Sequence, residues 1–85
     1  MSSKNNKFYL KITNPDGLVF GGDALMFSST NEKGNFDILP NHTNFISTIN
    51  KHLKITMLDK KTKDIDFDTG VVRVENNIVD VYLGV

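Results

Sequence analysis

The chain has no cysteine, no excess of charge of either sign and no long hydrophobic run. Without cysteine, neither a disulfide framework nor a thiolate zinc site can form. Ten acidic residues balance ten lysines and arginines, whereas a nucleic-acid-binding protein usually shows a basic excess or stripe. No apolar stretch approaches the roughly 20 residues with which a helix crosses a bilayer. We therefore predict no nucleic-acid partner and no insertion into a membrane.

The size of the chain allows one domain. It has 85 residues, of which 39% are hydrophobic, and a chain of this length buries about 60–65% of its unfolded surface on folding. Residues 1–7 (MSSKNNK) are polar and lack the apolar run of a signal peptide. We predict a disordered N-terminus over residues 1–7 and one folded domain over residues 8–85.

Hydrophobic and polar residues alternate through several segments of this domain. Successive side chains of a β-strand point to opposite faces, so the alternation predicts strands with one buried face each. No long segment shows the spacing of an amphipathic helix. The positions predicted to be buried are Phe8, Leu10, Ile12, Leu53, Ile55, Met57, Ile65, Phe67, Val72, Val74, Val79, Val81 and Leu83.

Turn-forming residues separate these segments. Residues 14–17 (NPDG) contain a proline, which fixes φ, and a glycine, which permits positive φ. Residues 31–34 (NEKG) and 59–63 (DKKTK) are polar connections, and residues 76–77 (NN) suit a two-residue hairpin because asparagine tolerates left-handed conformations. Short strands joined by tight turns predict an all-β fold, a small antiparallel β-sandwich of about eight to ten short strands in two sheets.

The residues that could carry out catalysis form no recognisable motif. The chain has two histidines, His42 and His52, and its serines at 28, 29 and 47 lack the glycine-rich elbow of a nucleophile. The glycines at 21 and 22 lack the glycine–lysine pattern of a phosphate-binding loop. We therefore predict no catalytic residue and no cofactor-binding site, and we expect His52 to lie exposed at a strand edge.

Three aspartates alternate with hydrophobic residues at positions 64, 66 and 68. A calcium loop would also need a glycine at a sharp turn and a bidentate glutamate further on. The alternation instead favours the solvated face of a strand, and no metal site is predicted. The expected pairing is between Asp64, Asp66 and Asp68 on one side and the lysines Lys54 and Lys11 on neighbouring strands.

A second feature surrounds position 40. Phe36 and Ile38 share one face of a predicted strand and should join the core, whereas Leu39 points the other way. Leu39 and the following proline are predicted to form an exposed apolar patch, and such patches commonly mark partner surfaces. Phe45 and Ile46 either extend this patch or complete the core.

Three blocks of the sequence resemble the epsilon subunits of F-type ATP synthases, which are called delta in mitochondria. Residues 34–42 (GNFDILPNH) resemble the family's glycine–x–aromatic–x–Ile–Leu–Pro–Gly–His signature. Residues 12–20 (ITNPDGLVF) resemble its opening strand and turn, and residues 69–77 (TGVVRVENN) resemble its Ser-Gly-Gly-Phe-Leu-Glu-Val hairpin. The blocks occur in the family's order and spacing. The loops depart from the pattern at Asp37, Asn41, Thr43, Asn44 and Thr69.

The resemblance implies a non-catalytic subunit of the central stalk, or rotor. Its partners would be the gamma subunit and the membrane c-ring, which it couples during proton-driven ATP synthesis. It would be peripheral to the membrane, on the cytoplasmic face in a bacterium or the equivalent face in an organelle. The residues that match the rotor-facing surface are Glu32, Asn35, Asn41, His42 and Thr43, with Leu53 as a weaker candidate for the stalk.

Two interpretations of His42 stand together at this stage. Its ring can stabilise the turn after Pro40 through a backbone carbonyl, take part in the partner surface, or do both. The sequence ends at Val85, where family members continue into an inhibitory two-helix hairpin, so the resemblance implies coupling without inhibition. The alternatives are a free-standing β-sandwich module that binds another protein and, less favoured, a small enzyme.

Overall fold

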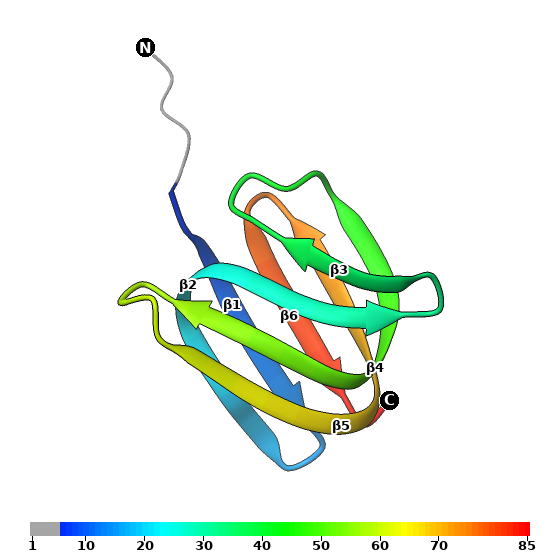
Figure 1. Cartoon of the computed structure of the whole chain (residues 1–85). Coiled ribbons are helices and arrows are strands. Elements are labelled where there is room, and N and C mark those ends of the chain that lie inside the picture. The colour runs from blue at the N-terminus through cyan, green and yellow to red at the C-terminus, as the bar shows by residue number, and fades with distance from the viewer. Residues whose placement is uncertain (1–5) are drawn as a thin grey trace.

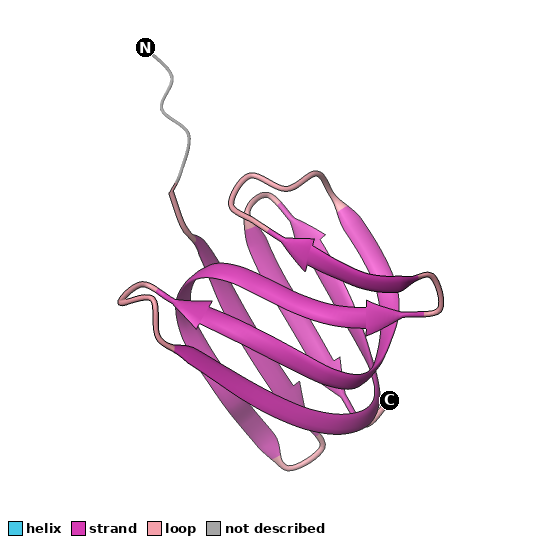
Figure 2. Ribbon diagram, viewed as in Figure 1, coloured by secondary structure: helices cyan, strands magenta, loops and turns pink. Residues whose placement is uncertain are grey.

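The computed structural model describes residues 6–85, and these residues form strands and no helix (Figure 2). Of the segment predicted to be disordered, residues 1–5 lie outside the described range. The prediction of an all-β fold is confirmed. Within residues 6–85 no helix is long and apolar enough to cross a membrane. The strands are β1 (Phe8–Asn14), β2 (Gly17–Asn31), β3 (Gly34–Ile38), β4 (Phe45–Met57), β5 (Thr62–Glu75) and β6 (Ile78–Leu83).

The six strands form a two-layered sandwich whose sheet closes on itself (Figure 1). The strand order is β1-β6-β5-β4-β2-β3, and an additional pairing of β1 with β2 closes the first five of these strands into a ring. β3 pairs with β2 and lies at the edge. The pairs are antiparallel, as predicted, except that β1 and β6 run parallel.

The described chain has fewer and longer strands than the eight to ten expected. β2, β4 and β5 have 15, 13 and 14 residues, and each passes from one layer to the other (Figure 1). β-bulges allow this, because an extra residue in one strand bends it and increases its twist. The β4–β5 bulge lies between Asn50 and Lys51, and Lys51 has a φ of 74°. Just beyond the bulge, the hydroxyl of Ser29 on β2 donates to the carbonyl of His52 at 2.8 Å.

The core lies between the two layers and follows the predicted alternation. Met57, Ile65 and Phe67 are half-buried and pack against it. Phe27 and Ile49, which were not among the predicted positions, are also buried in it. Burying such side chains contributes about 1.5–3 kcal/mol each to folding. The buried hydrophobic residues are Phe8, Leu10, Ile12, Ala24, Phe27, Ile38, Ile49, Leu53, Ile55, Val72, Val74, Val79, Val81 and Leu83.

The β5–β6 turn confirms the two-residue hairpin predicted for the paired asparagines. Asn76 and Asn77 have φ values of 51° and 64°, the left-handed conformation that a type I′ turn requires at both positions. The turn therefore places the side chain of Asn77 at the same end of the sandwich as the start of β1, beside the loop between β3 and β4.

Candidate functional site

The structure brings together three of the six residues expected at a partner surface. Asn41, His42 and Thr43 lie in the segment that joins β3 to β4, residues 39–44, which we call the β3–β4 loop. Asn41 and Thr43 are exposed, and His42 is half-buried. Asn41 adopts a φ of 66°, which asparagine tolerates better than other non-glycine residues. The loop therefore presents side-chain and backbone polar groups to solvent at one end of the sandwich.

The ring of His42 is fixed within the β3–β4 loop. Its backbone N–H donates to the carbonyl of Leu39 at 3.1 Å, which closes a turn. Its Nδ1 lies 2.8 Å from the carbonyl oxygen of Thr43, and because a carbonyl only accepts, Nδ1 donates. The ring also meets Phe45 edge-on, with centroids 5.6 Å apart. The interpretation of His42 as a turn-stabilising residue is confirmed, and its role at a partner surface stays a prediction.

Exposed apolar side chains lie in this loop and just after it. Leu39 is 52% exposed and Ile46 is 69% exposed, whereas Phe45 packs against the core and against Phe36, with centroids 5.6 Å apart. Phe45 therefore completes the core, as the second alternative predicted, whereas Ile46 stays on the surface, as the first predicted. Ile46 also lines a shallow groove of about 470 Å³ together with Asn44, Phe45, Arg73, Val74 and Glu75.

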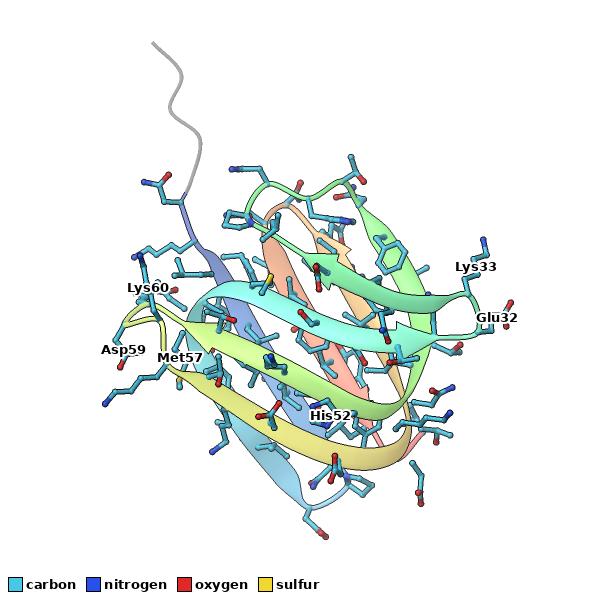
Figure 3. The ribbon with its side chains drawn as sticks, viewed as in Figure 1. Glu32, Lys33, His52, Met57, Asp59 and Lys60 are labelled. Atoms are coloured by element: carbon cyan, nitrogen blue, oxygen red, sulfur yellow. The ribbon has the colours of Figure 1, made fainter. Side chains whose placement is uncertain are left out.

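Glu32 and Asn35 lie apart from the β3–β4 loop. Glu32 is exposed in the β2–β3 turn, beside Lys33 (Figure 3). Asn35 follows on β3, on the outer face, where its Oδ1 accepts a hydrogen bond of 3.0 Å from the hydroxyl of Thr30. These two residues therefore form a second exposed region, at the opposite end of β3 from the loop.

Leu53 requires a correction, because its side chain has no exposed surface. It lies on β4 and packs in the core, so it cannot contact a partner directly. Alternation along β4 places its neighbours His52 and Lys54 on the outer face instead. We therefore leave Leu53 out of the proposed surface.

His52 occupies a position that the sequence did not predict. It is exposed, as expected, but it lies within a strand that pairs with neighbours on both sides rather than at an edge. Its Nδ1 is 2.7 Å from Oδ1 of Asp66, and its Nε2 is 2.9 Å from Oδ1 of Asp64. Among residues 6–85, Asp64 and Asp66 thus pair with His52 in place of the expected Lys54 and Lys11.

The two carboxylates favour the charged form of His52. Neutral imidazole carries one N–H, so it can donate to only one of two acceptors, whereas imidazolium donates to both. The hydrogen bond to Asp66, and then that to Asp64, raises the pKa of His52 above its ordinary value. No group of three or more histidine, aspartate or glutamate side chains that could hold a metal ion occurs among residues 6–85.

The stability of the domain is expected to depend on this protonation. Because the pKa of His52 is raised by folding, the contribution is complete below the unfolded pKa of about 6.5 and disappears as pH rises through the folded value. His52→Gln should therefore destabilise the protein at about pH 5 and have little effect at about pH 9. The side chain is 46% exposed, so we expect a difference below about 1 kcal/mol.

Urea unfolding of the wild type and the variant at both pH values measures this effect. The two proteins share the other titratable groups, so subtracting their free energies of unfolding isolates His52. Equal destabilisation by His52→Gln at low and high pH would show that the proton on His52 does not contribute.

Comparisons with known proteins place residues 7–83 in the family described as ATP synthase, Delta/Epsilon chain, beta-sandwich domain. The ATP synthase epsilon chain of Campylobacter fetus subsp. fetus is 33% identical over 81 residues, which cover 89% of this chain and 60% of that protein. The ATP synthase epsilon chain of Clostridium botulinum is 32% identical over 76 residues, covering 88% and 57%. The chain thus spans less than two thirds of the length of these relatives.

Solved structures share the fold at low sequence identity. A chain of the Euglena gracilis mitochondrial ATP synthase, in the OSCP/F1/c-ring assembly, superposes with a TM-score of 0.89 over 96% of this chain and 53% of that one, at 14% identity. A chain of the Tetrahymena thermophila mitochondrial ATP synthase, in the central stalk/c-ring assembly, superposes with a TM-score of 0.78 over 95% and 66%, at 15% identity. These similarities support the sandwich architecture.

Proposed function

This chain belongs to the delta/epsilon chain family of ATP synthases, whose β-sandwich domain it forms, and from this membership we propose that it is a non-catalytic subunit of the central stalk. In this role it fastens the gamma subunit to the c-ring, so that rotation of the ring during proton-driven synthesis turns the stalk. The observation that supports the proposal most strongly is the family match over residues 7–83. The domain is then peripheral to the membrane, which it reaches through the complex.

The β3–β4 loop is the surface that we propose for the rotor partners. It combines exposed polar residues, Asn41 and Thr43, with the exposed apolar side chains of Leu39 and Ile46 nearby. Protein interfaces commonly combine an apolar centre with a polar rim in this way. Glu32 and Asn35 are proposed to extend the contact along β3. A bridging subunit needs more than one contact region, and these two regions lie at opposite ends of that strand.

The experiment that tests this function is affinity purification from the native membrane with identification of the chains that bind. We expect the gamma subunit and the c-ring. We also propose that the sandwich couples without inhibiting, so adding it to an ATPase depleted of its epsilon chain should leave the rate of hydrolysis nearly unchanged. Recovery of an unrelated partner would instead favour the free-standing binding module, and strong suppression of hydrolysis would contradict coupling without inhibition.

Introducing charge at the proposed surface is expected to weaken assembly. The double variant Asn35→Lys, His42→Glu should bind a gamma–c-ring subcomplex about tenfold more weakly. Each new charge would lose its hydration on binding or meet a like charge of the partner, and both effects cost binding free energy. Both positions have exposed or half-buried side chains, so the domain should remain folded. Pulldown titration measures the affinity, and circular dichroism checks the fold.

A matched control places a new charge away from the surface. Lys60 lies at the tip of the β4–β5 turn, away from the β3–β4 loop (Figure 3), and Lys60→Glu should bind the subcomplex like the wild type. If the folded double variant binds as tightly as Lys60→Glu, the surface has been assigned to the wrong residues, whatever the partner.

A further inference from the structure

Asn77, in the β5–β6 turn, connects three separate parts of the chain. Its Oδ1 accepts a hydrogen bond of 2.8 Å from the backbone N–H of Asn41, and its Nδ2 donates to the carbonyl of Lys7 at 2.7 Å. Its own carbonyl accepts from the N–H of Tyr9 at 3.3 Å. One asparagine thus bonds the β3–β4 loop, 36 residues away, and the start of β1, up to 70 residues away.

The orientation of this amide follows from its partners. An N–H can only donate and a carbonyl can only accept, so the oxygen of the amide must face Asn41 and the nitrogen must face Lys7. A flipped amide would place donor against donor and acceptor against acceptor. Oδ1 and Nδ2 of Asn77 therefore each form a hydrogen bond with the backbone of a different segment.

The β3–β4 loop is tethered to this turn at both of its ends. Asn41 bonds Asn77 near the start of the loop, and near its end Oδ1 of Asn44 accepts from the backbone N–H of Asn76 at 3.3 Å. Bonds within the loop itself involve His42, to Leu39 and to Thr43. A loop ordered before binding loses less conformational entropy when a partner binds. Contacts from the turn that order the loop would therefore strengthen the binding of a partner to it.

We propose that Asn77 is a positioning residue, which sets the shape of the β3–β4 loop and thereby the affinity of that loop for the rotor. The part of this inference that concerns the partner rests on the proposed function, and the part that concerns loop shape does not. Asparagine suits the position for three reasons, since it tolerates the φ of 64°, accepts from Asn41 and donates to Lys7. Glycine keeps only the first property, and aspartate keeps the first two.

The experiment compares Asn77→Gly with Asn77→Asp in the full chain. Asn77→Gly is expected to speed hydrogen exchange at the Asn41 amide by about fivefold or more and to weaken binding to the gamma–c-ring subcomplex by about five- to tenfold, the loss expected for one hydrogen bond. Asn77→Asp keeps an oxygen facing Asn41 but turns its second oxygen toward the carbonyl of Lys7, where acceptor meets acceptor. Exchange at the Asn41 amide should therefore rise, and affinity fall, by clearly less than in Asn77→Gly.

The matched control is Asn76→Gly, in the same turn. It also replaces a left-handed asparagine, with a φ of 51°, but keeps the backbone N–H that bonds Asn44. Exchange at Asn41 and affinity should both remain near the wild-type values. A general loss of stability in the turn would affect the two glycine variants alike, whereas loss of positioning affects Asn77→Gly alone.

Two results would overturn the proposal. One is equal exchange at Asn41 in Asn77→Gly and Asn76→Gly. The other is a folded Asn77→Asp variant that exchanges at Asn41 about fivefold or more faster than the wild type, the rise expected of Asn77→Gly. This second comparison needs only the aspartate variant and the wild type. If the wild type itself does not bind the subcomplex, the proposed function fails, while the exchange data still decide whether Asn77 shapes the loop.

Discussion

Phe27→Ala is expected to lower the free energy of unfolding by about 3–5 kcal/mol, the cost of emptying a fully buried phenylalanine site. Phe27 is 0% exposed and lies on β2 between Ile38 of β3 and Ile55 of β4. The β2 backbone is held by strands on both sides at this point, so the space cannot easily close. A chain of this size has a total stability of about 4–12 kcal/mol, and the variant loses much of it.

Urea unfolding followed by circular dichroism measures the change. The control is Leu18→Ala, which truncates a side chain that is 67% exposed and should change the free energy of unfolding by less than about 0.5 kcal/mol. If Phe27→Ala cost no more than this control, β2 would not cross the core as described.

Gly70→Ala is expected to destabilise the domain by about 2–3 kcal/mol through overpacking. A Cβ at this position would lie 2.7 Å from the carbonyl oxygen of Tyr82 and 3.1 Å from Cδ2 of Leu83. The first contact is with the backbone, so relief requires β5 and β6 to separate rather than a side chain to rotate. Gly70 pairs with Ile49 on one side and Leu83 on the other, which leaves the strand no free direction in which to move.

Gly22→Ala is the matched control for this variant. The nearest atom to a Cβ at Gly22 is Cζ of Phe20 at 3.8 Å, an ordinary contact. The same chemical change should therefore cost less than about 0.5 kcal/mol there. Comparable losses at both glycines would mean that general backbone effects, and not the contact with Tyr82, decide the outcome at Gly70.

Much of the fold was predictable because it follows from local alternation. Leu53 and Ile55 on β4, and Val79 and Val81 on β6, are buried in the structure as their alternate spacing predicts. The number of strands was not predictable from the same signal. The β4–β5 bulge falls at Lys51, whose φ is 74°. Lysine, unlike glycine or asparagine, gives no indication in the sequence that a residue adopts positive φ. Long bent strands therefore looked like pairs of shorter ones.

The surface residues show where each kind of inference fails. Leu53 was placed at the partner surface from family resemblance, although alternation with Ile55 already predicted its burial. The pairing of His52 with Asp64 and Asp66 depends on the register of β4 against β5, and a shift of one residue reverses every side chain. Asn77 looked like an ordinary turn former, because its contacts with Asn41 and Lys7 arise only when distant segments meet.

The parallel pairing of β1 with β6 determines how the domain responds to mechanical load. Tyr9–Thr13 run alongside Ile78–Tyr82 in the same direction, so the beginning of β1 and the end of β6 lie at opposite ends of the paired ladder. A force that pulls these two ends apart acts along the strands and loads the evenly spaced hydrogen bonds of the ladder in shear, all at once. An antiparallel pair pulled from adjacent ends would instead unzip bond by bond. The domain should therefore transmit tension between its first and last strands without opening at either one.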